Sequence, residues 1–149
     1  MITKKSVLFL LFFITTNIIA IENTISVTEP WIRSAPPTAK ILGAFMNLHN
    51  DSNKEVRLTR VVADKFNRIE IHRTIDSNGF MKMVRQDYVP IPAQGSISLK
   101  PGSWHMMIIN PIIVPVLGEE VTLELEFDNN TKISVSFKIM DGLMQMKHK

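Results

Sequence analysis

The feature that most constrains the fold is a succession of short alternating or apolar runs, each ended by turn-forming residues. Alternation with a period of two places side chains on opposite faces of a strand, and no window after residue 20 shows the 3.6-residue period of a helix. The breaks hold typical turn residues, such as Asp76-Ser77-Asn78-Gly79 and Pro101-Gly102. The pattern predicts strands at Ile25–Glu29, Gly43–His49, Val56–Val62, Arg68–Ile75, Phe80–Gln86, Ile97–Leu99, Trp104–Ile109, Val121–Phe127 and Lys132–Met140.

Strands of this number and spacing predict an all-β fold, either a β-sandwich or a Greek-key barrel. A chain of 149 residues holds one domain with a real core, which we place at residues 21–140. Proline lacks the backbone donor that a central strand needs. We therefore expect Ala35-Pro36-Pro37 and Pro90-Ile91-Pro92 to lie in loops or at sheet edges.

The first twenty residues have the layout of a secretory signal peptide. Lys4-Lys5 precedes the apolar run Val7–Ile14, and Ala20 offers a small residue for cleavage. The alternative is a membrane anchor, but the run is shorter than the roughly 20 residues that span a bilayer. No cysteine follows it to carry a lipid. We expect export, with no stable membrane insertion after cleavage.

The net charge limits the partners that can be inferred, and the absence of cysteine limits the chemistry. Without Lys4 and Lys5 the formal charge falls by two from +3 to +1, which gives no basis for a nucleic-acid partner. The fold has no disulfides, and thiolate sites for zinc, iron–sulfur clusters or blue copper are excluded. A soft-metal site must therefore be built from the nine methionines and four histidines.

Four of these side chains fall at positions where strands could bring them together. His72 has the parity opposite to the apolar Ile71, so it should point away from the core. His105 and Met107 are two apart and share a face, and Met83 lies across a predicted hairpin from His72. Taken singly, each is more simply explained as a surface histidine or a core methionine.

Taken together, two imidazoles and two thioethers make a neutral, soft ligand set. Such a set favours a tetrahedral Cu(I) ion over zinc, calcium or magnesium. Only the imidazoles carry exchangeable protons, so binding should weaken below about pH 6. Neutral ligands hold Cu(I) less tightly than a thiolate pair, so a cysteine-containing acceptor could remove the ion. These properties favour a carrier over a storage site or a redox enzyme.

The spacing His72-x10-Met83-x21-His105-x-Met107 resembles the H-x10-M-x21-H-x-M motif of periplasmic PCu(A)C-type copper chaperones. Chance agreement at three further positions is on the order of 10⁻⁴ per starting histidine. The resemblance extends over most of the chain after residue 20. The chain departs from the family pattern at Arg73 and Ser103. The similar segments are Trp31-Ile32-Arg33, Gly43-Ala44-Phe45-Met46, Glu70-Ile71-His72, Ile91-Pro92-Ala93 and Leu99-Lys100-Pro101-Gly102.

The resemblance implies a cupredoxin-like β-sandwich with Cu(I) at an exposed site near one end, in a periplasmic protein that is not an enzyme. It also implies delivery to respiratory oxidase assembly, at the CuA centre of cytochrome c oxidase. The acceptor would be an oxidase subunit or another copper chaperone.

Two other functions remain open. One is an exported interaction module in which methionine and histidine are incidental, and the other is a copper-dependent redox factor for oxidase assembly. The missing cysteine argues against a thiol reductase. We expect residues 141–149 to form a flexible tail. The sequence leaves open whether this tail holds a second copper site. Its candidate ligands are Met140, Met144, Met146 and His148.

Overall fold

The computed structural model describes residues 24–145, which form ten strands and one short helical turn. All nine predicted strands are present, and one strand was not predicted. The elements are β1 (Ile25–Arg33), β2 (Ile41–Asn50), β3 (Val56–Val62), β4 (Ile69–Ser77), β5 (Phe80–Gln86), β6 (Val89–Ile91), β7 (Gly95–Leu99), β8 (Trp104–Ile109), β9 (Glu120–Phe127), β10 (Lys132–Met140) and α1 (Gly142–Gln145).

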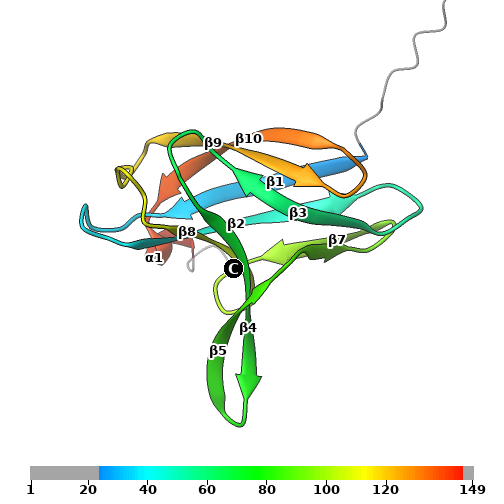
Figure 1. Ribbon diagram of the computed structural model, residues 1–149, viewed down its shortest axis with the longest axis horizontal. Helices are drawn as coiled ribbons and strands as arrows, with labels where there is room; N and C mark the ends of the chain where they lie inside the picture. The colour runs from blue at the N-terminus through cyan, green and yellow to red at the C-terminus, as the bar shows by residue number, and fades with distance from the viewer. Residues whose placement is uncertain (1–23, 146–149) are drawn as a thin grey trace, which may run out of the picture.

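The strands form one sheet in the order β5-β4-β8-β7-β2-β1-β10-β9-β3-β6. β8 also pairs with β2, next to β7, and the β1–β10 pairing is parallel. β3 packs close to β4, and β6 close to β2 and β7, although these strands share no ladder. The sheet therefore folds over itself into two layers (Figure 1). This confirms the predicted all-β sandwich.

The core lies between the layers and follows the alternation of the strands. On β9, Val121, Leu123, Leu125 and Phe127 are buried and the residues between them are more exposed. Phe137 on the neighbouring β10 is fully buried and lies opposite Val121. With no cysteine in the chain, stability depends on burial of this apolar surface.

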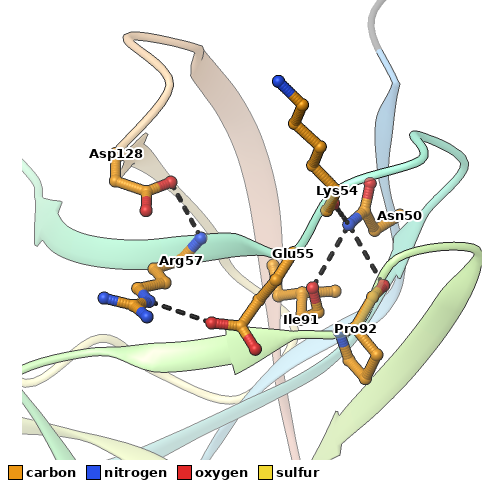
Figure 2. A network of polar contacts seen from close by, with 7 residues as sticks. All are labelled: Asn50, Lys54, Glu55, Arg57, Ile91, Pro92 and Asp128. Atoms are coloured by element: carbon orange, nitrogen blue, oxygen red, sulfur yellow. Dashed lines mark hydrogen bonds and ion pairs between the residues drawn. The ribbon is translucent and has the colours of Figure 1, made fainter.

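The strand that was not predicted, β6, is one edge of the sheet and contains Pro90. This agrees with the expectation that the proline segment lies at an edge. Asn50, at the end of β2, is fully buried and fixes this edge (Figure 2). Its Nδ2 donates to the carbonyl oxygens of Ile91 at 3.2 Å, Pro92 at 3.1 Å and Lys54 at 2.8 Å.

β1 continues to Arg33, beyond its predicted end at Glu29. The register with β2 shifts between Thr28 and Trp31, and Glu29 has a positive φ of 51°. A bulge at this point accommodates Pro30 without ending the strand. The strand therefore extends four residues past its predicted end.

β4 and β5 form a hairpin that projects away from the rest of the sheet (Figure 1). Asn78 and Gly79 both have positive φ, at 55° and 83°, as a tight hairpin turn requires. Asp76 Oδ1 accepts a hydrogen bond of 2.8 Å from the Gly79 amide and holds the turn closed. β5 is the second edge of the sheet.

Two sequence predictions fall on the ends of the chain. The signal peptide at residues 1–20 lies outside the described residues. Within the predicted tail at residues 141–149, Gly142–Gln145 form α1. Residues 146–149 lie outside the described residues. Between residues 24 and 145, no helix has the length and apolar character to cross a bilayer.

Candidate metal centre

The strand register places the four predicted ligands on one face of β5, β4 and β8. His72 lies directly opposite His105. Met107 lies opposite Glu70 on the same ladder, and Met83 lies opposite Thr74 across the hairpin. Residues that pair in antiparallel strands point to the same side, and diagonal neighbours are within reach of long side chains. The two histidines therefore lie between Met83 of β5 and Met107 of β8.

The two imidazole rings face each other with their centroids 5.9 Å apart and their planes tilted by 33°. His105 Nδ1 lies 2.9 Å from the carbonyl oxygen of Ser103, and His72 Nε2 lies 2.9 Å from Glu70 Oε2. Both oxygens only accept, so each of these nitrogens carries the ring proton. The opposite nitrogens, His72 Nδ1 and His105 Nε2, then hold lone pairs.

Those two lone-pair nitrogens are buried and have no hydrogen-bond partner among the described residues. A buried polar atom without a partner is rare, because it loses its interaction with water and gains nothing. Metal-ligating histidines show the same arrangement, with one ring nitrogen bound to a carboxylate or carbonyl and the other directed at the ion. The two inner nitrogens are therefore available to hold a metal ion.

A proline–glycine turn holds the carbonyl group that orients His105. The Ser103 amide donates to the Lys100 oxygen at 3.1 Å, and Gly102 has the positive φ of 80° that the turn needs. The Ser103 oxygen also accepts a 3.1 Å hydrogen bond from the Thr74 amide. One carbonyl therefore ties the β7–β8 turn both to the histidine ring and to the hairpin.

Glu70 orients His72 and is itself held by two arginines. Its side chain is buried, and its Oε1 lies 2.9 Å from Arg68 Nε and 3.5 Å from an Arg85 guanidinium nitrogen. The hydrogen bond from His72, together with the charges of Arg68 and Arg85, lowers the pKa of Glu70 despite its burial. The carboxylate therefore stays ionised and keeps the proton of His72 on Nε2.

Sequence reasoning gave Glu70 no role in the site. The available signal was its position two residues before His72 on a strand, which places both side chains on one face. Arg73, the departure that follows His72, lies over the Trp104 ring at 5.2 Å on the opposite face. Arg73 and Trp104 therefore do not line the centre.

The centre is closed at β8 and open at β5. His105 is only 6% exposed, whereas Met83 is 61% exposed. Met107 and His72 are intermediate. A bound ion would be reached from the hairpin side, near the projecting edge of the sheet.

The remaining candidates lie elsewhere. Met46 is in the core and His49 bonds to Thr28 Oγ1 at 3.1 Å, so both stay outside the centre. Of the candidate ligands in the tail, Met146 and His148 lie outside the described residues. Within residues 24–145, no group of three or more histidine and carboxylate side chains is placed to hold a metal. The candidate centre is therefore the one that includes thioethers.

Solved structures of copper-binding domains are similar to this fold. The copper-bound PCuAC domain from PmoF2 superposes with a TM-score of 0.69 at 17% identity, over 79% of this chain and 93% of that chain. CuI-DR1885 from Deinococcus radiodurans superposes with a TM-score of 0.62 at 22% identity, over 80% of this chain and 78% of that one. The fold is therefore the cupredoxin-like β fold of PCuAC domains.

Sequence comparison gives the family. Uncharacterized protein RP573 of Rickettsia prowazekii (strain Madrid E) is 34% identical over 131 residues, which cover 83% of this chain and 70% of that protein. The family model described as "Putative lipoprotein LpqE-like" matches residues 25–139, from the start of β1 almost to the end of β10. The chain therefore belongs to the LpqE-like family.

Proposed function

We propose that this protein is an exported, periplasmic copper(I) chaperone that binds one ion between His72, Met83, His105 and Met107. The observation that carries the proposal is the pair of facing imidazoles whose inner nitrogens are buried and have no partner in the described structure. Two thioethers on the same sheet face complete a neutral, soft set of four ligands. Cu(I) is the common biological ion that such a set prefers.

The construction of the centre suits transfer rather than turnover. The ligands are neutral, so ligands of higher affinity, such as a thiolate pair, can remove the ion. The exposed Met83 gives an acceptor access. The resemblance to PCu(A)C-type chaperones indicates the acceptor, which we propose to be the CuA centre of cytochrome c oxidase or another copper chaperone that serves it. The similarity to the copper-bound PCuAC domain from PmoF2 supports copper binding by this fold.

Cu(I) titration followed by X-ray absorption tests the proposal directly. We expect one ion per chain, with a scattering shell of two nitrogens and two sulfurs. Oxygen and nitrogen differ from sulfur in distance and scattering strength, so the spectrum separates this shell from a surface carboxylate site. A shell of oxygen atoms only would end the proposal.

Replacement of the carboxylate behind His72 should weaken the centre without removing a ligand. In Glu70→Gln, the charge that favours the Nε2 proton of His72 is lost, and Arg68 and Arg85 lose their counter-charge. We expect Cu(I) affinity to fall about 10- to 100-fold, as for other groups that orient metal-bound histidines. Competition titration measures the affinity, and ¹⁵N chemical shifts of the His72 ring report its tautomer.

Glu126→Gln is the matched control for this variant. Glu126 is also paired with a lysine and an arginine, Lys132 at 2.8 Å and Arg60 at 3.6 Å, but it lies on β9, away from the centre. Its replacement should leave Cu(I) affinity unchanged. Equal affinities in the two variants would contradict the positioning role of Glu70.

A further inference from the structure

Both methionines on β5 are exposed, which is unusual for this side chain. Met81 is 66% exposed and Met83 is 61% exposed, whereas Met46 and Met106 are buried in the core. A methionine that fills space in a core has a packing reason to be there. Neither exposed thioether has one, so their placement needs another explanation.

The two thioethers lie side by side on the face that carries the metal centre. They are two residues apart on a strand, which places them about 6.6 Å apart along one face. In the hairpin ladder, Met83 lies opposite Thr74 and Met81 opposite Asp76, so both follow His72 outward along the same face. Exposure rises along this path from His105 to Met81.

The path ends at the most accessible part of the centre. β5 is an edge strand, and no other strand in the described structure pairs with its outer side. The hairpin also projects from the body of the sheet (Figure 1). An acceptor that approaches the centre from this side would contact Met81 before it reaches His72 and His105.

We propose that Met81 and Met83 form a second, transient Cu(I) position through which the ion leaves the centre. The proposal rests on the proposed function and extends it to the route of transfer. Asp76, opposite Met81, is an unsuitable ligand for Cu(I), because a carboxylate oxygen is a hard ligand. Asp76 Oδ1 also already accepts a hydrogen bond from the Gly79 amide. The position therefore consists of two thioethers alone.

The exchange needs no oxidant or reductant, and the two acceptor cysteines bind as thiolates after their protons pass to solvent. The bonds from copper to His72, His105 and Met107 break, the bond to Met83 is kept, and a bond to Met81 forms. Two thiolates of the acceptor then replace the two thioethers, and copper stays Cu(I) throughout. Because Met83 belongs to both positions, the ion need not be released into water between them.

Met81→Leu tests this route, since leucine keeps the apolar bulk and removes the sulfur. We expect equilibrium Cu(I) affinity to change by less than about twofold, as for an ordinary surface substitution. The second-order rate of transfer to a Cys-x-x-Cys peptide, measured by stopped flow, should fall by about tenfold because one transient bond is missing from the transition state. Phe80→Leu is the control, as Phe80 is the 78% exposed neighbour on the opposite face and has no sulfur.

The outcomes separate the two proposals. Transfer at the wild-type rate in Met81→Leu would overturn the exit position and leave the chaperone function standing. An equal loss of rate in Phe80→Leu would overturn it too, because apolar contact rather than sulfur would then be responsible. A loss of affinity in Met81→Leu as large as in Met83→Leu would make Met81 a resident ligand and also overturn it. Failure of the unaltered protein to bind Cu(I) would instead end the proposed function.

Discussion

Joint replacement of His105 and Met107, as His105→Asn with Met107→Leu, is expected to abolish specific Cu(I) binding while the sandwich stays folded. The pair supplies one nitrogen and one sulfur of the proposed four ligands from a single strand, β8. Loss of groups that merely orient a ligand costs 10–100-fold in affinity, so loss of two ligands should cost at least about a hundredfold. Leucine is close to methionine in volume. Asparagine is smaller than histidine but keeps a donor for the Ser103 carbonyl.

Competition titration with a chromophoric Cu(I) chelator measures this loss, and far-ultraviolet circular dichroism checks the fold. Met107→Leu alone provides a milder variant, because leucine and methionine exchange with little strain. His49→Asn is the control, since His49 lies outside the centre and bonds to Thr28. Retention of a one-to-one Cu(I) complex by the double variant would show that the ion binds elsewhere.

Much of the fold was predictable because its strands alternate regularly. β9 and β10 appear almost at their predicted bounds, since their apolar residues recur every second position between clear turns. β6 was not predicted, because three residues around Pro90 carry too little pattern. Its pairing depends on β3 and on the buried Asn50, which are distant in sequence. The order of strands in the sheet is likewise set by contacts between distant segments.

The centre was predictable where local geometry decides it. A period of two places His105 with Met107, and the Asn78-Gly79 turn brings Met83 near His72. The direct opposition of His72 and His105 is different, because it depends on how β4 pairs with β8. The tautomers depend on Glu70 and on the Ser103 carbonyl, whose positions follow from the folded backbone. These features have no signature in the spacing of residues.

Phe137→Ala is expected to lower the free energy of unfolding by about 3–5 kcal/mol, as for other buried phenylalanines. Phe137 is fully buried within the core. The variant loses the transfer free energy of the ring and leaves a cavity that neighbouring strands fill only in part. A domain of this kind has about 5–15 kcal/mol in total, and no disulfide limits the unfolded chain. Urea denaturation should show a lower midpoint with an unchanged slope.

Phe80→Ala is the matched control, because it makes the same chemical change at a side chain that is 78% exposed. Its effect should stay within about 0.5 kcal/mol. Addition of Cu(I) at a hundred times its dissociation constant should restore about 2.7 kcal/mol to Phe137→Ala, since the ion binds only the folded centre. Equal midpoints for the two variants would contradict the core assigned to Phe137. If copper raised neither midpoint, the ion would not bind the folded chain in preference to the unfolded one. The proposal that the folded sheet brings the four ligands together would then be contradicted.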